Sequence, residues 1–358
     1  MRVFHCDGCG QTVFFENSVC VACERTLAYL PELGAMAALE PLDDGTWRSL
    51  APASDGAEVR LCENGITHAI CNWAVAMEDA DSLCRSCRLT QMLPALDVGG
   101  NLEAWRKLEA AKRRLVYTLL DLGLPLDGLR YRFLSDDGDD VQGSVLTGHE
   151  DGIITINIAE ADDLERERRR LNLHEPYRTL LGHFRHEVGH YYWDRLIRDG
   201  DRLQAFRECF GDERQDYASA LQRHYERGPA PQWQASHVSA YASVHPWEDW
   251  AETWAHYLHM LDSLETAVRC GVRIRPQRDD EPSLTSWDGT PLEQRPFDML
   301  IREWLALTYV LNNLNRSLGL ADGYPFVLAE PVIRKLRFIH ENLRPAAPPS
   351  AVANGVAP

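Results

Sequence analysis

The chain has no long hydrophobic run and little positive charge. No stretch of about 18 apolar residues occurs in its 358 residues, and Met1 to Cys6 begin no run of signal-peptide type. A net charge of −17 argues against binding to nucleic-acid phosphates and to anionic membrane surfaces. We therefore expect a protein that remains in the cytoplasm and binds neither nucleic acid nor a membrane.

Cysteine is scarce outside two compact groups near the N-terminus. Eight of the ten cysteines belong to these groups, whereas Cys209 and Cys270 stand apart and are interpreted as reduced core residues. A secreted chain would use its cysteines for disulfides, but the spacing inside the two groups is typical of metal sites. This pattern fits a reducing cytoplasm.

The first group forms two Cys-x-x-Cys pairs, which predict a structural zinc ribbon in residues 1–30. Its four candidate ligands are Cys6, Cys9, Cys20 and Cys23. A redox dithiol would need only one such pair. Charged residues give this segment a net charge of −1, from Arg2 and Arg25 against Asp7, Glu16 and Glu24. It therefore lacks the basic stripe of a nucleic-acid-binding ribbon, and a protein partner is the interaction we consider.

The second group contains one tight pair and defines a cysteine-rich module in residues 31–98. Its candidate ligands for a second structural zinc ion are Cys62, Cys71, Cys84 and Cys87. His68 is a candidate substitute for Cys62 or Cys71. Four separate buried thiols are the alternative interpretation.

The most informative motif in the rest of the chain is the pentapeptide His186-Glu187-Val188-Gly189-His190. On a helix, residues four apart lie on one face, so the two imidazoles can bind one metal ion. Glu187 follows the first histidine and is placed to accept a proton from a zinc-bound water. The pattern therefore predicts half of a catalytic zinc site with its general base.

A second helix, expected to begin at Pro246, offers the missing ligand. Glu248 and Glu252 lie four apart on one face of it, among tryptophans that bury the rest of the helix. Carboxylates on an apolar helix are costly to bury without a partner, and a metal ion would serve. Glu248, Glu252, His245 and His256 all remain candidates for the third ligand on this argument.

The two helices together resemble the gluzincins, which are zinc peptidases with two histidine ligands and one glutamate ligand. Within that group the chain resembles a family of zinc-binding metallopeptidases with N-terminal zinc ribbons. The resemblance implies that Glu248 binds zinc and that Glu252 supports a histidine ligand from the second shell. It also implies a role for Tyr241, because one gluzincin branch has an oxyanion-assisting tyrosine seven residues before its zinc glutamate.

The remaining pattern predicts an α+β protein. Amphipathic periodicity indicates helices at 102–122, 202–209, 213–227, 232–243, 297–318 and 331–343, and a charged helix at 161–171. Short β-type runs at 129–134, 144–146 and 152–158 predict a small antiparallel sheet, whose edge strand could hold an extended peptide. We expect a mainly helical, zincin-like domain in residues 99–343 and a disordered tail in residues 344–358.

The sequence thus predicts a cytoplasmic zinc peptidase with one catalytic and two structural zinc ions. Its substrate would be a peptide or protein. The competing hypothesis is a non-enzymatic scaffold, in which the ribbons bind a partner and the metal of the helical domain is structural. A purely structural site has no use for Glu187 beside the metal and normally closes its fourth position with a protein ligand.

Overall fold

The computed structural model describes residues 2–136, 145–172, 179–285 and 289–343. The tail predicted to be disordered, residues 344–358, lies outside these ranges. In the described residues no helix is both long and apolar enough to cross a membrane.

The N-terminal part is built from two small β structures. A hairpin, β1 (Phe4–His5) with β2 (Thr12–Val13), precedes a five-stranded antiparallel sheet in the order β3-β4-β5-β6-β7. The sheet strands are β3 (Thr26–Leu30), β4 (Ala35–Pro41), β5 (Trp47–Ser49), β6 (Glu58–Leu61) and β7 (Ala74–Ala76), and α1 (Glu63–His68) lies between the last two. Local sequence does not predict this sheet, because several strands are short and β4 is rich in alanine, which disfavours strands.

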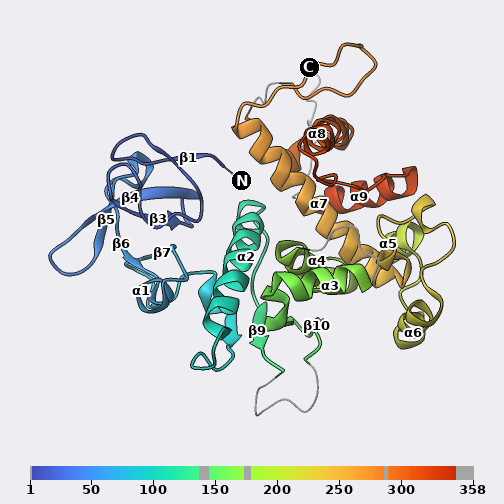
Figure 1. Ribbon diagram of the computed structural model, residues 1–358, viewed down its shortest axis with the longest axis horizontal. Helices are drawn as coiled ribbons and strands as arrows, with labels where there is room; N and C mark the ends of the chain where they lie inside the picture. The colour runs from blue at the N-terminus through green and yellow to red at the C-terminus, as the bar shows by residue number, and fades with distance from the viewer. Residues whose placement is uncertain (1, 137–144, 173–178, 286–288, 344–358) are drawn as a thin grey trace, which may run out of the picture.

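Helix α2 (Asn101–Asp121) joins the N-terminal part to the helical part (Figure 1). The ring of Tyr117 lies 5.3 Å from that of Phe15 and 5.8 Å from that of Tyr29, measured between centroids. The same helix packs against α4 (Leu180–Trp193). The hydrophobic core therefore runs without a break from the N-terminal part into the helical part.

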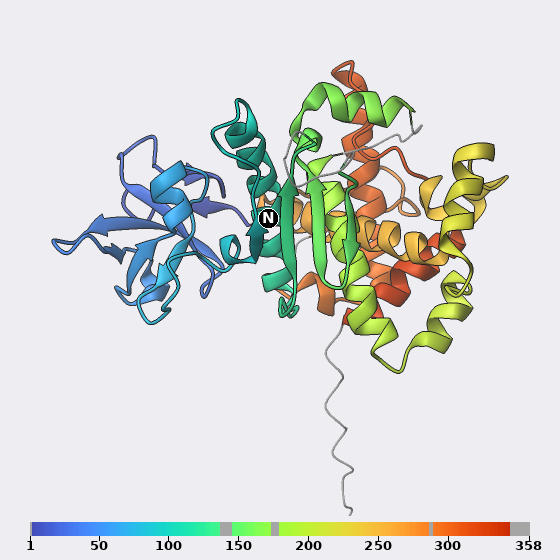
Figure 2. The same ribbon diagram turned by 90° about the horizontal axis from the view of Figure 1, so that it is seen from below.

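The second sheet has four strands in the order β10-β11-β9-β8 and is visible in green in the middle of Figure 2. Strands β8 (Thr90–Met92), β9 (Arg130–Leu134) and β11 (Ile153–Asn157) are parallel, and only the edge strand β10 (Gly148–Glu150) runs antiparallel to its neighbour. The sheet is thus mixed, with its antiparallel pair at the edge. The predicted α+β class is confirmed.

The edge strand β10 lies at residues 148–150, between the strands predicted at 144–146 and 152–158. The strand predicted at 144–146 is therefore wrong for its described residues, Val145 and Leu146. The real turn is only two residues long. Asp151 and Gly152 have φ angles of 47° and 82°, as a tight primed hairpin turn requires, and Glu150 pairs directly with Ile153. An Asp-Gly pair is the sequence signal that would have located this hairpin.

The other helices follow the predicted periodicity closely. They are α3 (Asp163–Asn172), α5 (Leu203–Phe210), α6 (Tyr217–Arg227), α7 (Pro246–Arg269), α8 (Phe297–Ser317) and α9 (Glu330–Leu343). Residues 232–243, predicted to be helical, form only two short 3-10 turns, Trp233–Ala235 and Tyr241–Ser243. Proline and glycine before this segment and serines within it favour turns over a regular helix.

Helices α4 and α7 make the most extensive helix contact in the described structure. They meet at Gly189, whose carbonyl oxygen accepts a 2.8 Å hydrogen bond from the indole Nε1 of Trp250. One turn before Gly189, Arg185 pairs with Asp262, which also accepts a hydrogen bond from Thr118 of α2. These contacts fix the relative position of α2, α4 and α7.

Replacing Gly189 by valine should separate α4 from α7. Even a single added Cβ would lie 3.1 Å from Ala251 Cα and 3.2 Å from Trp254 Cδ1. We expect a free energy of unfolding about 1–3 kcal/mol lower, measured by chemical denaturation. Gly99→Val is the control, because a Cβ there meets nothing within 4 Å. Equal stability of the two variants would show that the crossing is not tightly packed.

Candidate metal centres

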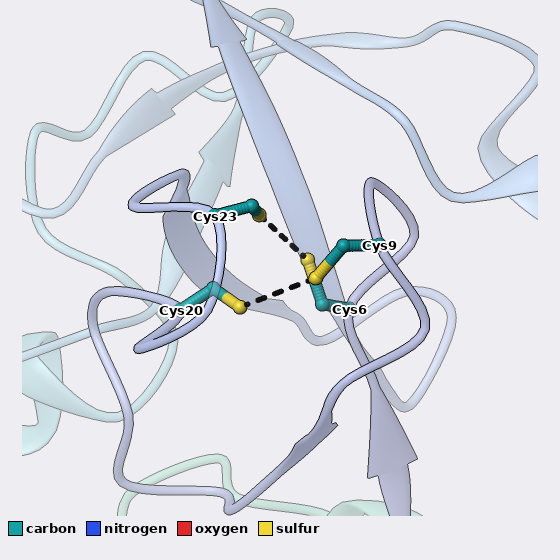
Figure 3. A group of neighbouring side chains, drawn as sticks. All are labelled: Cys6, Cys9, Cys20 and Cys23. Atoms are coloured by element: carbon teal, nitrogen blue, oxygen red, sulfur yellow. Dashed lines mark hydrogen bonds between the residues drawn. The ribbon is translucent and has the colours of Figure 1, made fainter.

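The first cysteine cluster lies in the N-terminal part, with Cys9 exposed and Cys23 partly exposed. Figure 3 shows Cys6, Cys9, Cys20 and Cys23 pointing toward a common centre, with Sγ–Sγ distances of 3.6 Å for Cys6–Cys23 and for Cys9–Cys20. Zinc–sulfur bonds of about 2.3 Å in a tetrahedron place neighbouring sulfurs about 3.8 Å apart. The backbone N–H of Arg25 lowers the pKa of Cys23 to about 6, which favours the thiolate form that binds zinc. The cluster fits a zinc ion.

The second cluster has the same ligand set but is enclosed by protein. Its sulfurs belong to Cys62, Cys71, Cys84 and Cys87, with the Cys71 and Cys84 sulfurs 3.6 Å apart. Cys87 also lies 3.6 Å from Glu109 of α2, a fully buried carboxylate that pairs at 2.9 Å with the equally buried Lys112. The cluster is therefore packed directly against the helix that joins the two parts of the molecule. His68, the alternative ligand, instead packs edge-to-face against the ring of Trp105.

The third group combines the two helices that cross at Gly189. Nε2 of His186 lies 3.0 Å, and Nε2 of His190 lies 3.5 Å, from the same oxygen, Oε2 of Glu248. In a tetrahedral site with zinc–ligand bonds of about 2.0–2.1 Å, neighbouring ligand atoms are about 3.3 Å apart. The structure thus brings all three predicted ligands together at a separation that suits one zinc ion.

The environment of Glu248 also fits a cation. Its side chain is 2% exposed, and Oε2 has no hydrogen-bond partner in the described part of the chain, which is costly for a buried carboxylate. Burial alone would raise the pKa of Glu248, but the imidazoles of His190 and His186 hold it well below its usual value. A metal ion at this point would balance the charge of the buried carboxylate.

Glu252 supports the outer side of His186. Its Oε1 lies 2.7 Å from Nδ1 of His186, and its Oε2 accepts a 2.6 Å hydrogen bond from the hydroxyl of Ser239. With the proton on Nδ1, the inner nitrogen Nε2 is left free to bind a metal. This is the arrangement that the gluzincin resemblance implies for Glu252.

Glu187 and Tyr241 lie beside the same group. Glu187 is 8% exposed, and the ring of Tyr241 lies 5.9 Å from that of His186. Burial raises the pKa of Tyr241 well above its usual value, and the negative charges of Glu248 and, more weakly, Glu187 add to the effect. Tyr241 is therefore a protonated hydroxyl near both the general-base candidate and the metal ligands.

Two other candidate ligands have different partners. His245 caps α7, because its Nδ1 accepts from the N–H of Trp247, while its Nε2 lies 3.1 Å from the carbonyl oxygen of Gln215. His256 is bonded through Nδ1 to the hydroxyl of Tyr324 at 2.8 Å. Neither belongs to the metal-type group.

Several neighbours of the site carried no clear sequence signal. Tyr217, at the start of α6, donates a 2.7 Å hydrogen bond to Oε1 of Glu248. The ring of Trp247 lies 3.9 Å from that of His190, and His149 of the edge strand stacks over His190 at 6.3 Å. Tyr217 and His149 come from segments distant in the sequence, so only the tertiary structure reveals that they lie at the site.

Comparison with known proteins identifies the class and then the family. Residues 3–98 match a zinc-ribbon domain, and residues 101–342 match the family described as "Putative zinc-binding metallo-peptidase". The second match spans more than half of the chain, so the chain belongs to this metallopeptidase family.

Similar full-length proteins occur in mycobacteria. An uncharacterized protein of Mycobacterium bovis (strain ATCC BAA-935 / AF2122/97) is 44% identical over 357 residues, covering 97% of each chain. Uncharacterized proteins of two Mycobacterium tuberculosis strains, CDC 1551 / Oshkosh and ATCC 25618 / H37Rv, match equally well, at 44% identity and 97% of each chain. No solved structure matches the chain significantly.

Metal analysis of the purified protein should find three zinc ions per chain, one for each group. Glu248→Ala removes a ligand of the histidine site and should leave two ions. Glu265→Ala, a control on the same helix beside Tyr117, should keep three. Inductively coupled plasma mass spectrometry gives the count, and three ions in Glu248→Ala would exclude Glu248 as a necessary ligand.

Proposed function

We propose that this chain is a zinc-dependent peptidase of the gluzincin type. The observation that carries the proposal is the convergence of two histidine nitrogens and one carboxylate oxygen beside Glu187. His186, His190 and Glu248 would hold the ion. When bound there, zinc supplies Lewis acidity toward the scissile carbonyl and lowers the pKa of a bound water.

Glu187 acts as the general base in this proposal. Its carboxylate follows His186 on α4 and is largely shielded from solvent, so it is held close to the ligands. It accepts the proton of the attacking water and later donates it to the leaving amine. Glu252 keeps a proton on Nδ1 of His186 and thereby orients that imidazole.

Tyr241 and the edge strand complete the proposed active site. The hydroxyl of Tyr241 would donate to the oxyanion that develops at the scissile carbonyl. Strand β10 lies at the edge of the sheet formed by the described strands and carries His149 next to His190. An extended peptide that pairs with this edge would run alongside the metal ligands.

The alternative is a non-enzymatic scaffold with a structural metal. A structural zinc site normally has four protein ligands, but within the described ranges only three side chains form this group. The side chain of His186 also keeps 12% of its surface exposed, so this ligand is not completely enclosed by protein. Both features favour the peptidase.

The proposed setting is the cytoplasm, where reducing conditions keep the eight clustered cysteines available for zinc. The substrate would be a peptide or protein, and the zinc-ribbon region could in addition bind a protein partner. Neither a nucleic acid nor a membrane is part of the proposal.

Glu187→Gln should lower kcat about 10²–10⁴-fold while zinc stays bound, because the amide cannot accept the proton. Hydrolysis of a fluorogenic peptide library measures activity, and metal analysis measures the zinc. Glu341→Gln, an exposed change on α9, should retain wild-type turnover. Undiminished hydrolysis by Glu187→Gln would rule out this residue as the base, and a wild-type protein that cleaves no peptide would refute the peptidase.

A further inference from the structure

The two oxygens of Glu248 have different surroundings. Oε2 faces Nε2 of both histidines and has no hydrogen-bond donor in the described chain. Oε1 accepts a 2.7 Å hydrogen bond from the hydroxyl of Tyr217. One oxygen is thus available to a metal while the other is already bound to the protein.

Tyr217 is held firmly in this position. It is the first residue of α6, whose N-terminus is capped by Asp216 accepting from the N–H of Ser219. Its ring packs edge-on against His245 at 5.4 Å and against Trp247 at 5.8 Å. His245 in turn contacts the carbonyl oxygen of Gln215, which ties the segment before α6 to the start of α7. The hydroxyl therefore approaches Glu248 along a fixed direction.

The hydroxyl of Tyr217 is the donor of this hydrogen bond, because an ionised carboxylate can only accept. A neutral hydroxyl stabilises the ionised carboxylate without removing its charge. Glu248 thus remains a full anionic ligand while one of its oxygens is occupied.

A carboxylate can bind zinc through one oxygen or through both. Binding through both would fill an additional coordination position, which a catalytic site must leave open for water or substrate. A hydrogen bond to the second oxygen opposes this mode, because the bond would have to break first. Residues that orient a ligand in this way commonly change metal affinity 10–100-fold when they are removed.

We infer that Tyr217 is a positioning residue that restricts Glu248 to binding the metal through Oε2 alone. The inference rests on the metal site of the proposed function but not on peptide hydrolysis. It assigns to Tyr217 a role separate from that of Tyr241, which is proposed to contact the substrate. In this role Tyr217 acts through its hydrogen bond to Glu248.

Tyr217→Phe tests the inference, because it removes only the hydroxyl. We expect zinc at the histidine site to bind 10–100-fold more weakly in competition with a chelator. The zinc ion of the histidine site is the one that is bound by the wild-type protein and absent from Glu248→Ala. Tyr225→Phe, a 61% exposed tyrosine on the same helix, is the matched control and should keep wild-type affinity. Wild-type affinity in Tyr217→Phe would overturn the inference.

A second measurement needs no variant at Tyr217. A crystal structure of the zinc-loaded wild-type protein should show Oε2 of Glu248 on the metal and Oε1 still bonded to Tyr217. Binding of both oxygens to zinc would refute the inference even if Tyr217→Phe failed to fold. A wild-type protein that holds zinc in this way but cleaves no peptide would refute the peptidase and leave the role of Tyr217 intact. Absence of zinc from the histidine site would overturn both.

Discussion

The close crossing of α4 and α7 is the contact on which the histidine site depends. Neither helix carries a complete ligand set, since two imidazoles belong to one and the carboxylates belong to the other. Gly189 lies between the two histidines and allows the backbone of Ala251 to come near, so that Glu248 and Glu252 both reach His186. The hydrogen bond from Trp250 to the Gly189 carbonyl oxygen holds the two helices in this position.

The two oxygens of each carboxylate at the histidine site have different partners. Glu252 uses one oxygen for His186 and the other for Ser239, and Glu248 uses one for the imidazoles and the other for Tyr217. An ionised carboxylate in the interior is tolerated only with such partners. The donors come from α6, from the segment before α7 and from α4, so elements distant in the sequence cooperate to hold one small group of ligands.

Features that depend on local periodicity or spacing could be read from the sequence. Cysteine pairs, the histidine pair and the long amphipathic helices all have characteristic intervals, and the α+β class followed from them. The five-stranded sheet could not be read in this way, because short or alanine-rich strands have no distinctive pattern. The edge strand β10 was missed although the Asp151-Gly152 pair that follows it is a typical signal of a tight hairpin turn. Tyr217 and Ser239 were missed for another reason. A hydroxyl that hydrogen-bonds a carboxylate far away in the sequence produces no recognisable pattern in the residues around it. Single tyrosines and serines are common in any chain, so only their final positions distinguish these two.

The two cysteine clusters differ in how far solvent reaches them. Cys9 is exposed at the surface, whereas Cys62, Cys84 and Cys87 are buried against the core near α2. An ion in the outer cluster can pass directly to a competing thiol, so its residence time depends on the thiolate bonds themselves. In the inner cluster only Cys71 is partly exposed, so release of an ion would be limited by how often the surrounding structure opens. Zinc bound in the outer cluster would therefore exchange with the zinc supply of the cell faster than zinc bound in the inner cluster.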